Sequence, residues 1–364
     1  PPASAAGRAR PRSFQEDWSA PATPKPPTTL ANDAQGGGSV ATVAAPGRAR
    51  IETAWGLDLS ADGTEVAFAR SSDGMGVAFA RAGATDRTGA VEICALRLAG
   101  DRVFQLTAAG LRSVSPRWSP DARWVAFLRG AAEDRLALWV VDRDGRTDRA
   151  LAPGPFTDLA WSPDGTRIAC GSVAGIRLVD PLSGTLLALT DGTDRAPRWS
   201  PDGRTLAFAR GSDGSRALHL VPAAGGAAVR LDTGGEAFDP SWSPDGGRLA
   251  FTAVMAAGRT RVAVATLAGT TVAGVERLGV TPFAESEPRW RADARGLSYL
   301  QRVGEGTVTV RRVLLASRID TPLADRPGAH ASARLGPDSE SLVYVLGDEI
   351  WSQPKSAVEP RRLT

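Results

Sequence analysis

The sequence is poor in residues on which many enzymes and redox proteins depend, because its 364 residues include only two cysteines and two histidines. The cysteines, Cys94 and Cys170, are too few for the disulfide scaffold of a small secreted protein. An exported chain could pair them, but the repeat in this sequence places them in units that are not neighbours, so we expect two buried free thiols. His219 and His330 lie far apart in the same repeat, and we expect both to be structural.

Long apolar runs are also missing. The longest are short segments such as 136–141, far below the ~18 residues that cross a bilayer. The net charge of +3 lies in the first 50 residues, where six basic side chains face three acidic ones, and residues 51–364 carry 37 of each sign. A neutral body argues against a large basic face for nucleic acid. We predict no membrane span and no nucleic-acid partner.

Catalytic motifs are absent as well. The serine segments 171–175 and 211–214 lack the Gly-x-Ser-x-Gly spacing of a nucleophile elbow. The sequence contains no His-Glu-x-x-His, no Cys-x-x-Cys and no phosphate-binding loop. We therefore predict no catalytic residues, no metal and no cofactor in this chain.

The first 50 residues are rich in Pro, Ala, Gly, Thr and Arg and show no sustained apolar period. This composition predicts a disordered tail or linker at 1–50, followed by a folded domain at 51–364. The chain begins with Pro1 rather than methionine, and no apolar signal core is visible. We expect its natural N-terminus to lie upstream.

The sequence does contain one feature in abundance, a repeat. "SPRWSPDARWVAFLRG" at 115–130 returns as "APRWSPDGRTLAFARG" at 196–211. Aligned on the turn aspartate, the copies are seven: Asp62, Asp121, Asp164, Asp202, Asp245, Asp293 and Asp338. Their spacings are 59, 43, 38, 43, 48 and 45 residues, which is the period of propeller blades with four short strands.

Each unit has a physical interpretation. A strand ends in an anchor residue, which is leucine in the first and last units and tryptophan in the five between, at Trp118, Trp161, Trp199, Trp242 and Trp290. Ser-Pro-Asp-Gly then forms a turn, because proline presets φ, the aspartate caps backbone N–H groups and glycine accepts a positive φ. We expect the tryptophans to pack between blades and each aspartate to cap its own turn rather than bind Ca²⁺, which carboxylates could also ligate.

The fold class predicted is all-β: a seven-bladed β-propeller with four antiparallel strands per blade. The first blade begins with its inner strand near 53–59, and the last ends with its outer strand at the final residue. No strand is therefore exchanged to close the ring. Closure must come from side-chain packing between the first and last blades.

These WD-like units resemble the propellers of TolB-like proteins and of the prolyl oligopeptidase family of serine peptidases. The resemblance rests on the five Trp-x-x-Asp turns, the following "VAF" or "LAF" strands and the terminal "LT" pairs, and it covers roughly 51–364. A long first interval, with an insertion around 71–89, and the unstrapped seven-blade ring favour the peptidase side. In that family the propeller limits which peptides reach a separate α/β-hydrolase domain, so the resemblance implies a fragment of a bacterial peptidase.

A charge pattern accompanies the anchors. The residue before the anchor is arginine in four units, at Arg117, Arg198, Arg289 and Arg334, and aspartate in the first, at Asp58. Inner strands border the central channel, where a long arginine stem can extend while its charged head stays wet. This predicts a partly cationic channel for acidic or carboxylate-bearing peptides, unless the arginines only pair locally with turn aspartates.

Three functions compete. The first is a gating propeller of a cytoplasmic serine peptidase, which binds peptide substrates and whose α/β-hydrolase domain lies outside this chain. The second is a stand-alone TolB-like scaffold for a protein partner, exported or periplasmic. The third is a propeller enzyme such as a lactonase or lyase, which needs inward-facing histidine or carboxylate clusters, and neither histidine lies in an inner-strand motif. A propeller fold alone does not decide among them.

Overall fold

The computed structural model describes residues 57–59, 65–71, 91–97, 102–107, 112–212, 214–278, 282–304, 307–323, 330–335, 341–346, 349–353 and 360–362. Contacts divide the chain into Pro1–Gly47 and Arg48–Thr364, and every described residue belongs to the second unit. The expected tail at 1–50 and the insertion around 71–89, apart from Ser71, lie outside the described residues.

The described strands form seven four-stranded antiparallel sheets, each built from four consecutive strands. Sheet 1 contains β1 (Leu57–Leu59), β2 (Glu65–Ser71), β3 (Val91–Arg97) and β4 (Arg102–Gln105). Sheet 2 contains β5 (Arg112–Trp118), β6 (Trp124–Gly130), β7 (Ala137–Asp142) and β8 (Asp148–Ala152). Sheet 3 contains β9 (Asp158–Trp161), β10 (Ile168–Gly171), β11 (Arg177–Val179) and β12 (Leu186–Ala188). Sheet 4 contains β13 (Asp194–Trp199), β14 (Thr205–Arg210), β15 (Ala217–Pro222) and β16 (Val229–Arg230).

Sheet 5 contains β17 (Ala237–Trp242), β18 (Arg248–Val254), β19 (Thr260–Ala268) and β20 (Thr271–Arg277). Sheet 6 contains β21 (Ala284–Trp290), β22 (Gly296–Gly304), β23 (Thr307–Leu314) and β24 (Asp320–Pro322). Sheet 7 contains β25 (His330–Leu335), β26 (Leu342–Leu346), β27 (Glu349–Gln353) and β28 (Arg361–Arg362). Two single-turn 3₁₀ helices, η1 (Glu133–Arg135) and η2 (Ala256–Gly258), follow β6 and β18.

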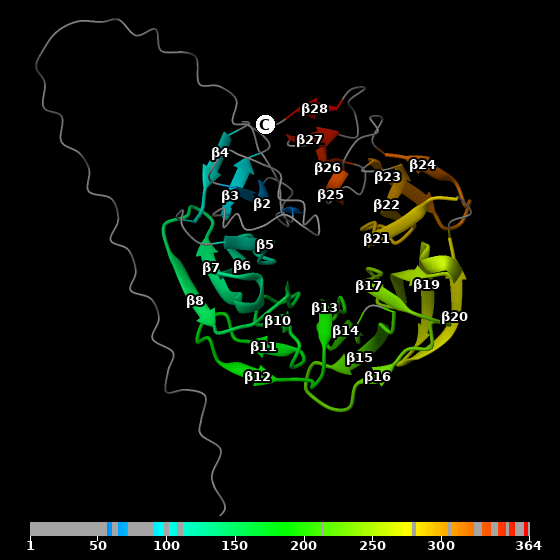
Figure 1. Cartoon of the computed structure of the whole chain (residues 1–364), viewed down its shortest axis with the longest axis horizontal. Coiled ribbons are helices and arrows are strands. Elements are labelled where there is room, and N and C mark those ends of the chain that lie inside the picture. The colour runs from blue at the N-terminus through cyan, green and yellow to red at the C-terminus, as the bar shows by residue number, and fades with distance from the viewer. Residues whose placement is uncertain are drawn as a thin grey trace, which may run out of the picture. The chain divides into compact units, whose positions relative to one another are not determined.

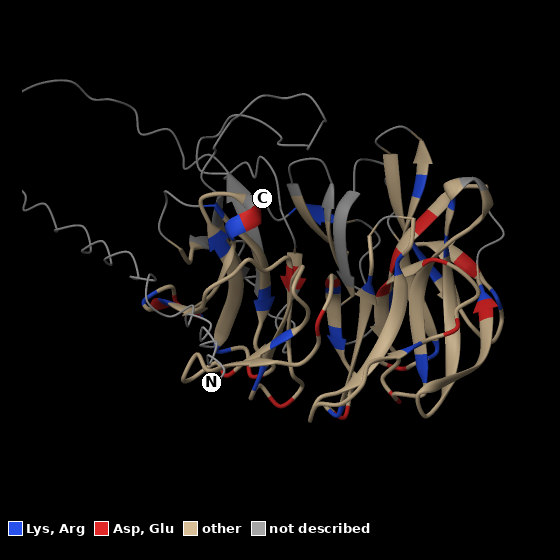
Figure 2. Cartoon of the chain, turned by 60° about the horizontal axis from the view of Figure 1, so that its bottom comes forward, with Lys and Arg blue, Asp and Glu red and all other residues tan. Residues whose placement is uncertain are grey.

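Within the folded unit, the sheets follow one another around a common centre, with the first strand of each sheet nearest to it (Figure 1). The second strands are apolar along most of their length, because neighbouring sheets cover both of their faces. Phe127, Phe208 and Phe251 occupy the same place in β6, β14 and β18, and all three are fully buried. Arginines and acidic residues are intermixed along the described strands and turns, without a large region of one sign (Figure 2).

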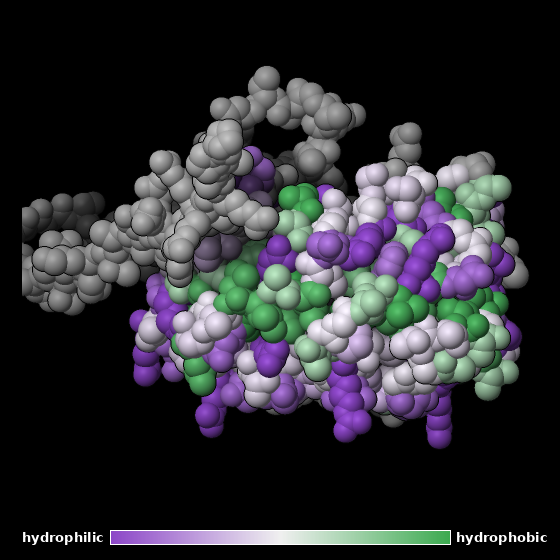
Figure 3. Space-filling view, turned by 90° about the horizontal axis from the view of Figure 1, so that it is seen from below, coloured by the Kyte–Doolittle hydropathy of each residue, from purple (hydrophilic) through white to green (hydrophobic). Residues whose placement is uncertain are grey.

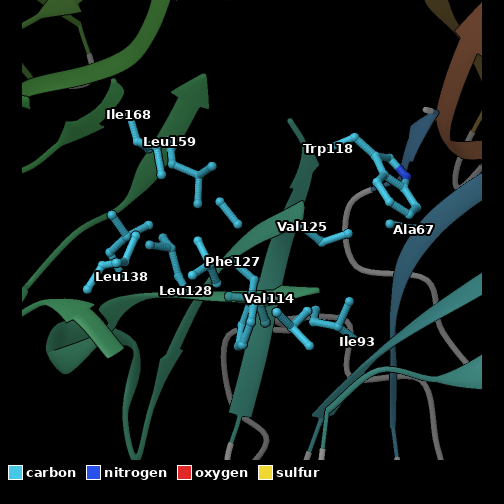
Figure 4. Packing of buried hydrophobic residues seen from close by; sticks show 14 of the residues in the cluster. Ala67, Ile93, Val114, Trp118, Val125, Phe127, Leu128, Leu138, Leu159 and Ile168 are labelled. Carbon is cyan, nitrogen blue, oxygen red and sulfur yellow. The ribbon is translucent and has the colours of Figure 1, made fainter. Parts of the chain in front are cut away.

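Apolar packing joins the sheets. One cluster spans sheets 1 to 3 and brings Ala67 and Ile93 of sheet 1 against β5 and Leu159 and Ile168 of sheet 3 against β6 and β7 (Figure 4). Four further clusters join sheets 3 and 4, 4 and 5, 5 and 6, and 6 and 7. Six successive interfaces therefore carry apolar packing in the described part of the chain.

The fold class needs a correction here. We expected a seven-bladed ring closed by side-chain packing between the first and last blades, but the apolar clusters among the described residues join only six successive pairs of sheets. β1 of sheet 1 lies beside β25 of sheet 7. The first and last units carry leucine at the anchor, and only the five between have the tryptophan that the regular interfaces use.

The tryptophans contribute hydrogen bonds as well as packing. The indole Nε1–H of each of four anchors donates to the backbone carbonyl of the residue before the anchor in the preceding sheet. The pairs are Trp161 to Arg117 at 3.1 Å, Trp199 to Ala160 at 3.1 Å, Trp242 to Arg198 at 3.1 Å and Trp290 to Ser241 at 2.9 Å. We call these four bonds the indole bonds. Each fixes the innermost strand of one sheet to that of the next.

The turns are held by their own side chains. In sheet 4, the Ser200 hydroxyl donates to the Asp202 carboxylate at 2.6 Å, and that carboxylate also accepts the Arg204 backbone N–H at 3.0 Å. These hydrogen bonds, the one from Ser200 first, lower the pKa of Asp202. The same Ser–Asp bond recurs at Asp121, Asp164 and Asp245, while in sheet 6 Arg291 takes the place of serine beside Asp293. Asp62 and Asp338 lie outside the described residues.

One expectation about histidine is wrong. Both histidines were expected outside the inner strands, but His330 is the first residue of β25, the inner strand of sheet 7. The repeat did not reveal this because β25 begins five residues before its anchor, in a stretch without the Pro-Arg-Trp sequence. Cys94 and Cys170 are buried and are not joined in a disulfide. No helix in the described part of the chain is long and apolar enough to cross a membrane.

The turn glycine position generates a first prediction. Gly203 has φ +70°, whereas Ala294 holds the same position in sheet 6 with φ +55°. A left-handed alanine is strained by about 1–2 kcal/mol. Ala294→Gly should therefore raise the free energy of unfolding by about 0.5–1 kcal/mol after the entropy cost of glycine. Urea denaturation measures it, and Gly203→Ala is the matched opposite: its Cβ has space, so strain alone should destabilise it. Equal stability of all three proteins would contradict the prediction.

A second prediction concerns the indole bonds. Trp199→Phe removes the donor to the half-buried Ala160 carbonyl and should cost about 1 kcal/mol beyond the loss of ring volume. Trp118→Phe is the control, because nothing among the described residues accepts the Trp118 indole N–H. Thermal unfolding of both variants should show the larger loss at Trp199. A loss at Trp118 as large as that at Trp199 would show that ring volume alone matters.

Candidate functional site

Bulges in the inner strands aim side chains at the centre of the folded unit. In β5, β13, β17 and β21 the register shifts at a residue that precedes proline and has a positive φ. These residues are Ser115, Ala196, Asp239 and Glu287, with φ between 50° and 56°. A bulge inserts one extra residue and redirects the side chains after it. The residue two positions later, directly before the anchor, then borders the centre.

The positions before the anchor meet at one cavity, which we call the hub cavity. It has a volume of about 370 Å³ and is lined by residues of five sheets: Asp58, Arg117, Trp118, Ser119, Pro120, Leu159, Ala160, Trp161, Arg198 and Arg289. Four of the five channel residues expected from the sequence are thus brought together. The side chain of the fifth, Arg334 in β25, lies outside the described residues.

The three arginines share one conformation. In each, the guanidinium Nη1 donates to the carbonyl of the proline just before it, at 2.7 Å for Arg117, 2.8 Å for Arg198 and 3.2 Å for Arg289. The local pairing with turn aspartates that we considered as an alternative is not how Arg117 and Arg198 are held in the described structure. Their contacts turn the guanidinium toward the hub cavity.

Electrostatics at the hub cavity are dominated by burial and like charge. Burial first, and then the charges of Arg289 and Arg117, lower the pKa of Arg198 to about 10. Burial also raises the pKa of the Asp239 carboxyl, while Arg289 opposes this shift. Arg198 remains charged near neutral pH, at an energetic cost that an anion would relieve.

Carboxylates near the hub cavity have partners of their own. Asp58 accepts the backbone N–H of Trp118 at 2.8 Å. Asp158 accepts the Thr157 hydroxyl at 3.0 Å. Glu287 lies 3.9 Å from Arg289, at the limit of an ion pair. The acidic groups therefore moderate the positive charge without engaging the arginines closely.

A second cavity was not foreseen. It has a volume of about 640 Å³ and opens beside the turns of sheets 2 and 3, where Trp124, Trp161, Arg149 and Leu182 contribute to its lining. Arg149 donates to the Pro181 carbonyl across it. The sequence held a weak signal in "WVVDRDG" and "LVDPLSG", which mark the outer turns of adjacent units, but nothing indicated that these turns would face one another.

Groups with catalytic potential are occupied elsewhere. His219 lies in β15, stacks on Phe208 with 5.6 Å between ring centroids, and contacts the Ala217 carbonyl at 3.1 Å. Burial raises the pKa of the Cys170 thiol far above its ordinary value, which suppresses the nucleophilic thiolate. Among the described residues, no group of three or more His, Cys, Asp or Glu is arranged to hold a metal ion.

Comparisons with known proteins agree with a propeller. The chain is 39% identical over 59 residues to "Uncharacterized peptidase YuxL" of Bacillus subtilis, a stretch that is 16% of this chain and 9% of that protein. The curated relatives it matches align over 9% to 42% of their own length, so the chain spans less than half of each.

Solved structures extend the likeness over most of the chain. The β-propeller domain of the Trilobed protease from Pyrococcus furiosus has a TM-score of 0.62 and 13% identity, covering 86% of this chain and 96% of that one. An oligogalacturonate lyase in complex with manganese has a TM-score of 0.63 and 14% identity, covering 86% and 88%. At these identities the likeness shows the fold alone. The family model described as the TolB β-propeller domain matches residues 129–349, more than half of the sequence, and the chain belongs to that family.

Proposed function

We propose that this chain is the substrate-selecting propeller of a serine peptidase of the prolyl oligopeptidase type, with catalysis supplied by an α/β-hydrolase domain. The observation that carries the proposal is the hub cavity, where side chains from five sheets line one space at the centre of the folded unit. A peptide that enters along the centre would contact all of them. The likeness to a protease propeller and the short match to a peptidase support the same assignment.

A binding role fits the chemistry of the cavity. Its lining offers guanidinium donors beside the apolar faces of Leu159 and Trp161, a combination that holds a peptide end and an adjacent side chain. Among the described residues, its lining includes Asp58 but no histidine. A propeller enzyme of the lyase or lactonase kind needs a cluster of histidines or carboxylates in the channel, and the described residues contain no group of three or more such side chains arranged to hold a metal ion.

The test is a chemical label on the natural full-length protein. A fluorophosphonate probe reacts with an activated serine, so the protein should be labelled at a Gly-x-Ser-x-Gly serine encoded beyond Thr364. The labelled protein should hydrolyse short peptides and spare folded proteins, because the propeller limits access. A reading frame without such a serine, or a full-length protein that the probe does not label, would refute the proposal.

A stand-alone scaffold for a protein partner is the second candidate, and one observation favours it. The edge strand β12 exposes Leu186 and Leu187, at 40% and 51% of their surfaces, and Leu182 nearby is 84% exposed. Figure 3 looks onto the rim formed by the outer strands and shows apolar atoms gathered on part of it. An exposed apolar edge is a template for an added strand.

If the scaffold function is correct, Leu187→Asp should abolish recovery of a specific co-purifying protein from the native host without lowering the melting temperature. Val229→Asp on the edge strand β16 of sheet 4 is the matched control, because that strand is only two residues long. Retention of the partner by the Leu187 variant would exclude the β12 edge as its docking strand.

A further inference from the structure

The hub cavity concentrates positive charge from alternate sheets. Arg117, Arg198 and Arg289 come from β5, β13 and β21, and the sheets between them place Ala160 and Ser241 at the corresponding positions. The alternation gives each guanidinium room beside a small neighbour. All three line a single cavity of about 370 Å³.

Most donors of these guanidiniums remain open. A guanidinium has five N–H donors, and the proline carbonyl occupies one in each arginine. Within the described structure, Arg117 and Arg198 form no ion pair, and Arg289 has only the long contact to Glu287. A half-buried cation without a close counter-ion is costly, so the packing of the surrounding sheets, rather than ion pairing, holds the three arginines in place.

In the described structure, the one acidic side chain within ion-pair distance of the three arginines is Glu287, at 3.9 Å from Arg289. Asp58 is bound to the Trp118 backbone, and Asp158 to the Thr157 hydroxyl. Burial raises the pKa of Asp239, and the charges of Arg289 and Arg198 oppose that shift. The repulsion among the arginines appears in the lowered pKa of Arg198, to which both Arg289 and Arg117 contribute after burial.

Size and shape restrict the ligand. A space of about 370 Å³ accepts a few residues or a small molecule and excludes a folded domain. The planar fork of a guanidinium matches a carboxylate with two parallel hydrogen bonds. Leu159 and Trp161 add an apolar wall beside the charged groups.

We propose that Arg117, Arg198 and Arg289 form a carboxylate-binding site that holds an acidic end of a peptide, with an apolar residue of that peptide against Leu159 and Trp161. This inference rests on the proposed function for its peptide ligand and names the class of peptide. The bound carboxylate takes the place of the missing counter-ion. The arginine site thereby makes the propeller selective for peptides that have a free C-terminal carboxylate or an acidic side chain.

The test is calorimetric titration of this chain with the tripeptide acetyl-Ala-Ala-Leu as the free acid and as the amide. The free acid should bind, and its affinity should fall as salt is raised, because the contact is between charges. The amide should bind at least tenfold more weakly. A third peptide, amidated at its end and carrying an internal aspartate, tests whether the site binds a side-chain carboxylate instead of a C-terminal one. Binding of either kind of carboxylate supports the site.

Arg198→Met should weaken binding of the acid at least tenfold and leave the melting temperature equal or higher, since it removes one of three repelling cations. Arg198→Lys keeps the charge but loses the fork and should give an intermediate affinity. Arg230→Met, on the exposed edge of the same sheet, should change neither quantity. A rise in stability with a loss of binding is a pattern that a purely structural arginine would not produce.

Three results would overturn the inference: equal binding of acid and amide, unchanged affinity in Arg198→Met, or binding of inorganic phosphate or a uronic-acid oligosaccharide with none of the peptides. None of these depends on a catalytic serine. The fluorophosphonate experiment can therefore succeed while the carboxylate site fails, and the reverse also holds.

Discussion

The indole bonds are the constraint on which the site depends. Each joins an anchor tryptophan to a backbone carbonyl of the preceding sheet, so the innermost strands are positioned by one another and not only by their own sheets. The carbonyls of Arg117, Ala160 and Arg198, three residues that line the hub cavity, are held in this way. The indole bonds therefore keep sheets 2 to 6 in register, and four of these sheets contribute side chains to the cavity.

Much of the fold could be predicted because the repeat records it directly. The Ser-Pro-Asp turn, the tryptophan anchor and the apolar second strand each follow from local chemistry, and their return at a regular spacing indicates a propeller. The way in which the first and last sheets pack against each other could not be predicted. Leu59 and Leu335 replace tryptophan at the ends of the repeat, and a sequence pattern does not reveal how the first and last sheets meet.

The candidate site was only partly visible in the sequence. That Arg117, Arg198 and Arg289 precede the anchors could be read directly, and inner strands were expected at the channel. The bulges were not anticipated, because a positive φ at Ser115 or Asp239 runs against the usual preference of residues before proline. The second cavity was not predicted for a different reason. It forms between the turns of two neighbouring units, and the sequence pattern of a single repeat unit does not predict contacts between units.

The indole bonds have one more consequence, for how such a molecule can change over evolutionary time. Each tryptophan donates its hydrogen bond to a backbone carbonyl, so the bond does not depend on the side chain of the accepting residue. Arginine, alanine and serine all occur at this accepting position. Mutation can thus rewrite the chemistry of the channel without disturbing the scaffold around it. Descendants of such a protein can therefore acquire new binding specificities through single substitutions at these positions while they keep the fold.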